Sequence, residues 1–196
     1  MPRSLVFLAV LLAPAPVTAQ AFVRVGAGVT ASTDFVKDFI VEPIGSRQSM
    51  APTVTGLVGW RLPSGNRLGV EVRYAMGTWE LADRGVTDDL GGLVTLGVAL
   101  VGDGPIRGAL RWEAVAGKLA YRPEREVGLF SGGAPSPWLV GGGLTWSRPM
   151  GGALALVVGA RYDYHGFNTD RLDGDDYTGR QAVHRLGLSL ALERGF

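Results

Sequence analysis

The stretch Leu186-Gly187-Leu188-Ser189-Leu190-Ala191-Leu192-Glu193 alternates leucine with small or charged residues. Successive side chains of a strand point to opposite faces, whereas a helix groups residues three and four apart. The leucines therefore share one face of a β-strand, and Glu193 lies on the other face with the small residues. A ribbon with one wholly apolar face has to bury that face against protein or against lipid.

The same alternation recurs earlier in the chain. Leu154, Leu156, Val158, Ala160, Tyr162 and Tyr164 oppose a face that carries Arg161, Asp163 and His165. Leu68, Val70, Val72 and Tyr74 oppose Glu71 and Arg73, and Ile106, Leu110 and Trp112 oppose Arg107, Arg111 and Glu113. Further strands are expected at about 21–30, 51–62, 90–102 and 136–148, which makes eight strands in all.

The connections between these segments alternate in length. Residues 63–66, 103–105 and 149–152 are short and rich in Pro, Gly, Asn and Asp, as tight turns are. The other connections, at about 31–49, 81–89, 122–135 and 167–179, are longer and polar or charged. Short turns at one end and long loops at the other are typical of up-and-down barrels in the outer membrane.

Two environments fit eight such strands, a soluble barrel or sandwich and a membrane barrel. Mean hydropathy is +0.18, and the polar faces combine glycine and alanine with charges of both signs in mid-strand. A solvated surface would carry Lys, Glu, Thr and Ser instead, so this pattern favours charges inside and leucines against lipid. Aromatic residues near the expected strand ends would form two interfacial girdles: Trp60, Trp79, Tyr121, Trp138, Trp146, Tyr162 and Tyr164. Trp112 is expected in mid-strand, outside these girdles.

The first 19 residues have the three parts of a secretory signal peptide: Arg3 near the start, the apolar run Leu5 to Leu12, and Val17-Thr18-Ala19 as a small-residue cleavage site. Residues 20–196 are then expected to form one domain. The chain has no cysteine, and its net charge of +1 gives no basic field of the kind that nucleic-acid binding requires.

The end of the chain, from Leu186 to Phe196, resembles the terminal strand that outer-membrane proteins present to the barrel-assembly machinery. Phe196, Leu192, Leu190 and Leu188 match its final aromatic and alternating apolar residues, and Arg194 stands where an apolar residue is usual. With the hairpin pattern, the whole mature chain resembles the small OmpA/OmpX-type barrels of the outer membrane protein β-barrel domain family. The resemblance implies an all-β, closed, eight-stranded antiparallel transmembrane barrel, long loops outside the cell, periplasmic termini, and contact with outer-membrane lipids and lipopolysaccharide.

A barrel of eight strands is just wide enough for its side chains to fill it, so a porin-like channel is not expected. Unpaired charges inside would be costly, so we expect Glu71, Glu113 and Asp163 to pair with Arg73, Arg111, Arg161 or Arg185. Further inward charges are expected at Arg24, Arg61, Arg107 and Glu193. The predicted role is non-enzymatic: membrane integrity, or adhesion and partner binding through the loops, by a monomer without metal or cofactor.

The alternative is an enzyme. The segment from Arg161 to Asn168 is similar to lipid A deacylase barrels, in which a His and a Ser lie two residues apart on a late strand. His165 matches the base, but Phe167 occupies the serine position, which removes the nucleophile of acyl transfer. His184 is expected to face His165 across the hairpin, and two histidines alone make a weak metal site. The first long connection, at about 31–49, contains the apolar residues Phe35, Phe39, Ile40 and Ile44. These side chains would either bind a partner or pack over the barrel mouth.

Overall fold

In this computed structural model, residues 20–38, 44–83, 85–126, 130, 136–168 and 180–196 are described. The predicted signal peptide lies outside these ranges. The described strands are β1 (Gln20–Ser32), β2 (Val36–Asp38), β3 (Ile44–Gln48), β4 (Ala51–Arg61), β5 (Arg67–Asp83), β6 (Val86–Arg107), β7 (Leu110–Pro123), β8 (Trp138–Gly151), β9 (Leu154–Asn168) and β10 (Arg180–Gly195). Among the described residues, no helix is long and apolar enough to cross a membrane.

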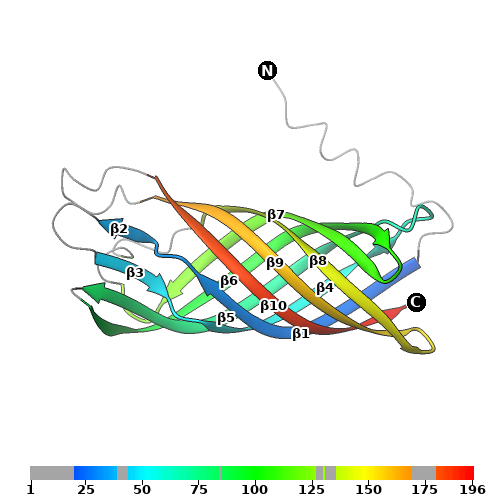
Figure 1. The fold of residues 1–196 in the computed structure, drawn as a ribbon, viewed down its shortest axis with the longest axis horizontal. Helices are drawn as coiled ribbons and strands as arrows, with labels where there is room; N and C mark the ends of the chain where they lie inside the picture. Colours follow the sequence, from blue (N-terminus) through cyan, green and yellow to red (C-terminus); the bar gives the residue numbers. More distant parts are fainter. Residues whose placement is uncertain (1–19, 39–43, 84, 127–129, 131–135, 169–179) are drawn as a thin grey trace, which may run out of the picture.

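Eight of these strands close into a barrel (Figure 1). From β4 to β10 each strand pairs antiparallel with the next, and β1 joins β4 to β10. The predicted all-β, up-and-down, eight-stranded fold is confirmed. Closure leaves the ring without an unpaired edge, so its backbone hydrogen bonds are satisfied within the sheet.

The closed ring is staggered by ten residues. Register partners run from Phe22 through Gly59, Gly69, Val101, Val115, Gly141, Asp163 and Arg185 and return to β1 at Ser32 rather than at Phe22. Such a stagger tilts the strands against the barrel axis, as Figure 1 shows. Register partners on neighbouring strands therefore lie at different heights along the barrel axis.

Glycines in left-handed conformations build the three short turns at one end, which we call the turn end. Gly65 has a φ of 80°, Gly108 of 58°, and Gly151 and Gly152 of 115° and 58°. Residues with a Cβ rarely adopt these angles, so glycine sets where these strands end. The turn predicted at 103–105 is wrong, because β6 runs on to Arg107 and the chain reverses at Gly108. Ile106 and Arg107 therefore belong to β6, across the hairpin from Leu110.

The opposite end, the loop end, is more regular than predicted. The segment at 81–89 is no long loop, because β5 and β6 stay paired as far as Asp83 and Val86. The predicted loop at 31–49 contains the β2–β3 pair, and β3 pairs with the loop-end part of β5, from Trp79 to Ala82. Sheet structure therefore continues beyond the ring on this side (Figure 1).

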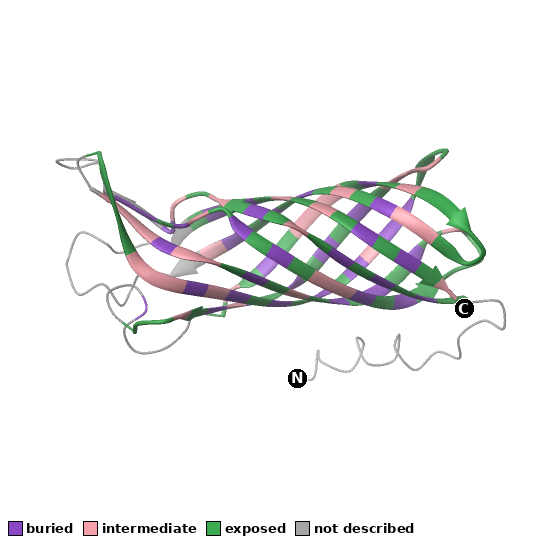
Figure 2. Ribbon diagram, turned by 90° about the horizontal axis from the view of Figure 1, so that it is seen from below, coloured by how far each residue is buried: buried purple, intermediate pink, exposed green. Residues whose placement is uncertain are grey.

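Exposure alternates along each strand, which gives the banded ribbon of Figure 2. Leu188 and Leu190 are each 56% exposed, whereas Arg161 is 9% and Arg185 2% exposed. The predicted orientation, with leucines outside and charges inside, is confirmed. Trp60, Trp112 and Trp146 all lie outside near the turn end, so Trp112 belongs to a girdle after all, whereas Trp79 and Tyr121 point inward and belong to none.

Candidate functional site

Glycines on the inward face of β8 make room for charged side chains. Gly141 and Gly143 are the register partners of Asp163 and Arg161 on β9. A Cβ on Gly141 would collide with the Asp163 carboxylate, and one on Gly143 would press on the backbone of Ala160 and Arg161. The small residues on the polar faces thus provide the space into which a polar interior fits.

Arg161 is the centre of the middle layer of this interior. Its guanidinium donates to Glu71 Oε1 at 2.8 Å and Oε2 at 3.1 Å, and to Glu113 at 3.3 Å. Arg73 donates to Asp163 at 2.6 Å and to Glu71 at 3.1 Å. Since β5 and β9 are four strands apart in the ring, the contact of Glu71 with Arg161 crosses the barrel.

A second layer of ion pairs closes the turn end. Arg67 donates to Asp103 at 2.8 Å and to Glu193 at 2.6 Å, and Arg24 binds Glu193 at 2.8 Å. Arg111 binds Asp103 at 2.7 Å, and Arg61, whose side chain is 45% exposed, reaches Glu193 at 3.3 Å. The barrel is therefore plugged twice by arginine and carboxylate side chains along its axis.

The structure places the predicted network residues as follows. Glu71, Arg73, Glu113, Arg161 and Asp163 come together in the middle layer, Arg111 binds Asp103 at the turn end, and Arg185 lies near the loop end. Of the four arginines offered as partners, Arg73 and Arg161 pair with the three acids. Arg111 binds Asp103 instead, and no described carboxylate lies within ion-pair distance of Arg185. Arg107 is exposed rather than inward.

Two main residues of the network, Arg67 and Asp103, were missed. Both continue the inward alternation of their strands, Arg67 before Gly69 and Glu71, and Asp103 after Ala99 and Val101. This two-residue alternation was the signal that could have found them. At residue 103 the neighbouring Gly and Pro predicted a turn instead, although Asp103 is 2% exposed inside the barrel.

A cavity of about 50 Å³ lies in the barrel interior, beside the middle layer. Charged residues including Glu71, Arg73 and Arg161 line it together with hydroxyl groups of Thr53, Thr145 and Ser189. It has room for a few water molecules but for no continuous channel.

A neutral polar cluster surrounds Arg185 beneath the loop end. Arg185 donates to the Tyr121 hydroxyl at 3.3 Å, to Gln48 Oε1 at 3.4 Å and to Thr95 Oγ1 at 3.3 Å. His165 Nε2 and the Tyr121 hydroxyl lie 2.8 Å apart. Among the described residues, the guanidinium is thus held by dipoles and not by a carboxylate.

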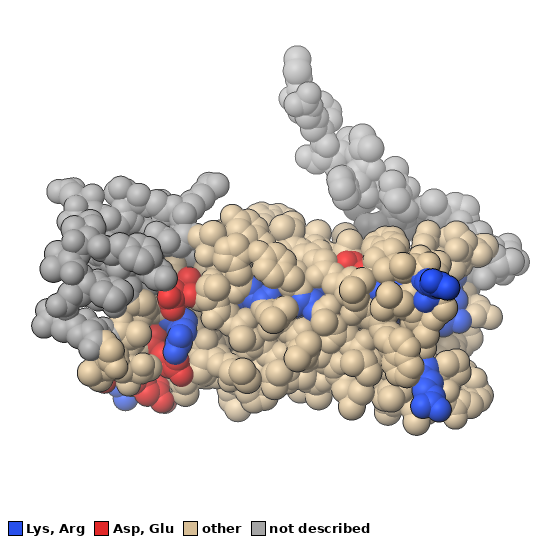
Figure 3. Space-filling view, in the orientation of Figure 1, with Lys and Arg blue, Asp and Glu red and all other residues tan. Residues whose placement is uncertain are grey.

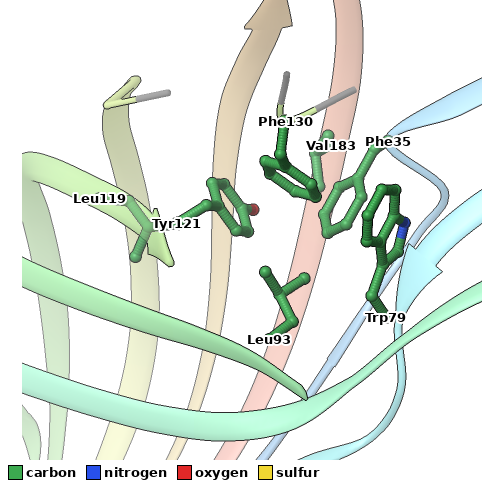
Figure 4. Packing of buried hydrophobic residues seen from close by; sticks show 7 residues of the cluster. All are labelled: Phe35, Trp79, Leu93, Leu119, Tyr121, Phe130 and Val183. Carbon is green, nitrogen blue, oxygen red and sulfur yellow. The ribbon is translucent and has the colours of Figure 1, made fainter. Parts of the chain in front are cut away.

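Apolar side chains cap this cluster (Figure 4). Phe35, Trp79, Leu93, Leu119, Tyr121, Phe130 and Val183 form one buried group. Phe35 packs edge-on against Tyr121 with centroids 5.1 Å apart, and Trp79 packs against Phe130 at 4.8 Å while its indole donates to Ser46 at 2.7 Å. Phe35 therefore packs over the barrel mouth, while Phe39 and Ile40 lie outside the described residues.

The two histidines lie on opposite faces of the sheet, so the prediction that they face each other is wrong. His165 points inward and is fully buried, while His184 is on the outer face and hydrogen-bonds with the Tyr162 hydroxyl. Among the described residues, His165 is fully buried and its Nε2 lies within hydrogen-bond distance of Tyr121, a member of the aromatic cap. The side chain of Phe167, at the position of the missing serine, is not described.

The terminal strand completes the ring. Leu188, Leu190 and Leu192 lie on its outer face, and the Phe196 amide donates to the Ala21 carbonyl at 2.9 Å. The aromatic side chain of Phe196 is 68% exposed at the turn end. The residues proposed as an assembly signal are thus presented to the surroundings of the barrel rather than packed inside it.

Comparison with solved structures identifies the same fold. Neisserial surface protein A superposes with a TM-score of 0.51 at 15% identity, covering 91% of this chain and 99% of that protein. The outer membrane protein OprG from Pseudomonas aeruginosa superposes with a TM-score of 0.52 at 12% identity, covering 91% of this chain and 96% of OprG. No family model matches the sequence, and no curated protein is significantly similar to it.

Proposed function

We propose that this protein is an integral barrel of the bacterial outer membrane, with a sealed interior and with its loop end exposed for contact outside the cell. One observation carries the proposal: an outer surface of exposed Leu, Val and aromatic residues encloses arginines and carboxylates. In water this arrangement would expose the apolar face to solvent, whereas in a bilayer the apolar face contacts lipid and the arrangement is stable. The printed names of the two similar structures, a surface protein and an outer membrane protein, support this location.

A sealed barrel argues for a role at the surface rather than in transport. Two layers of ion pairs and an aromatic cap stand between the ends of the barrel. At the loop end the extended β5–β6 hairpin carries exposed Asp88 and Asp89, and Glu124 and Glu126 follow β7. Figure 3 shows acidic side chains together with basic ones at the loop end, beside a middle part with few charges on its surface. This charged, hydrogen-bonded platform suits adhesion or partner binding.

Membrane insertion is tested first. The membrane fraction should contain a form whose gel migration changes on heating, and purified protein in planar bilayers should show no large, stable conductance. Recovery in the soluble fraction after lysis, or a steady channel of porin size, would overturn the proposal.

Adhesion and membrane integrity are separated by a second comparison. Cells that express wild-type protein are compared with cells expressing Asp88→Asn plus Asp89→Asn, and with a control carrying Arg148→Gln at the opposite end. We expect surface adhesion to fall in the hairpin variant alone, while detergent resistance stays equal in all three. Cells without the protein serve as a fourth strain, and a loss of detergent resistance in them without any change in adhesion would favour the integrity role instead.

Assembly and lipid contact follow from the same placement. The exposed Phe196 and the outward leucines of β10 are proposed as the element that the barrel-assembly machinery recognises, and the leucine belt as the surface that membrane lipids cover. Phe196→Ala should slow the appearance of the heat-modifiable form in cells without changing the stability of protein refolded in vitro. An unchanged rate in cells would remove this role.

A further inference from the structure

The turn end of the barrel opens into a basin of about 630 Å³. Arg61, Arg67 and Arg111 line it together with the polar side chains of Gln20 and Ser147. The Glu193 carboxylate, which Arg61 and Arg67 bind, also lines it, and the rest of the wall consists of glycine and apolar residues, including Pro149, Leu154 and Phe196. The basin thus combines a cluster of guanidinium groups with a small apolar wall.

Positive charge exceeds negative charge around this basin. Asp103 and Glu193 are the carboxylates there, and four arginines share them: Arg24, Arg61, Arg67 and Arg111. The exposed charges of this rim are also arginines, at Arg107, Arg148 and Arg194, with no exposed Asp or Glu side chain among the residues that the structure describes there. Figure 3 shows basic side chains at this end, whereas the opposite end carries both acidic and basic ones.

The arginines that line the basin retain unused donors. Arg67 is 4% exposed, and its Nη2 is buried without a hydrogen-bond partner although its Nε and Nη1 are fully engaged. Arg61 makes one long contact, of 3.3 Å, to Glu193. A buried guanidinium nitrogen without an acceptor is unfavourable, so an added acceptor at this place would be stabilising.

We propose that the basin is a binding site for a phosphate group. Guanidinium groups match phosphate oxygens in pairs of parallel hydrogen bonds, and a tetrahedral anion can accept from several arginines at once. Two sources share this chemistry, free phosphate and the phosphorylated glycerol of a lipid headgroup. The girdle of Trp60, Trp112 and Trp146 lies at the same end, and its level in a bilayer would be that of the headgroups.

Calorimetric titration tests the site on the full barrel refolded in a non-ionic detergent, in phosphate-free buffer at constant ionic strength. One arm uses inorganic phosphate and the other glycerol 3-phosphate. Wild type should bind with saturable heat at one site, Arg61→Gln should bind at least about tenfold more weakly, and Arg148→Gln should stay within about twofold of wild type. Arg148 is the matched control because it is exposed on the same rim and does not line the basin.

The outcomes separate the possibilities. Tighter binding of glycerol 3-phosphate assigns the site to a headgroup, and equal binding assigns it to free phosphate. Equal weakening by both substitutions would show a general positive field rather than a site, and no saturable heat would remove the proposal. If Arg61→Gln does not fold, the urea midpoint of wild type decides: phosphate must raise it above the value in chloride of the same ionic strength. None of these outcomes depends on what the loop end binds.

Discussion

Replacing Arg161 by methionine tests whether the middle layer holds the barrel together. Methionine keeps an unbranched chain of about the length of the arginine stem and removes the guanidinium. Glu71 keeps Arg73 at 3.1 Å, whereas Glu113 is left with Arg24 at 3.6 Å as its described ion-pair partner. Since both carboxylates are almost fully buried, the variant leaves buried negative charge with weaker compensation, above all at Glu113.

The expected cost follows from the energetics of such sites. Removing one partner of a buried ion pair destabilises a protein by about 3–5 kcal/mol, because the remaining charge stays desolvated. The double variant Arg161→Met plus Glu113→Gln should recover part of the loss, about 1–3 kcal/mol, since a neutral amide replaces the more isolated carboxylate. The two changes are not additive, because the residues are in direct contact at 3.3 Å.

Urea unfolding of the barrel in lipid vesicles, followed by the shift between folded and unfolded gel bands, measures these differences. Arg148→Met is the control, because Arg148 is exposed and its loss should change stability by no more than about 0.5 kcal/mol. A loss below about 1 kcal/mol for Arg161→Met, or a further loss in the double variant, would refute the reasoning.

Three further predictions address the outer face, the inward glycines and the cap. Leu190→Arg should cost about 2–4 kcal/mol in vesicles, because it puts a charge on the lipid-facing belt; an unchanged urea midpoint would argue against lipid contact there. Gly141→Ala should destabilise by about 1–3 kcal/mol, since its Cβ would meet the Asp163 carboxylate, whereas a Cβ at Gly56 would meet nothing within 4 Å and Gly56→Ala should be tolerated; equal effects in the same unfolding assay would contradict this. Phe35→Ala should loosen the aromatic cap and speed amide hydrogen exchange in the loop-end part of β7, while exchange in the turn-end half of the barrel stays slow. A uniform change in exchange across the barrel would rule out a local cap.

The alternation of side chains predicted the fold because it is a local property. Within each of the runs at 68–75, 154–165 and 186–193, the alternation itself shows which residues point outward. The orientation of the faces and the number of strands in the ring could therefore be predicted from the sequence. Turn positions were less certain, because Gly and Pro mark both turns and strand irregularities. Pro105 lies in β6 next to a register shift, two residues before the strand ends, and the backbone reverses only where Gly108 takes a positive φ.

The partners inside the barrel depend on a quantity that no single strand contains. Glu71 and Arg161 are 90 residues apart, and each was correctly expected to face inward. Whether they lie at one height is set by the ten-residue stagger of the closed ring, which raises the register partner on each successive strand toward the loop end. Arg111 lies near the start of β7, at the height of Asp103. Arg185 lies at the height of Tyr121 and Thr95, where no acidic side chain is described. The stagger therefore also explains why Arg185 has no described carboxylate partner, since the carboxylates of the middle layer pair with Arg73 and Arg161. Two residues inserted in one strand would change the stagger while keeping the alternation of faces, and would re-pair the layers, whereas an insertion in a turn should leave them intact.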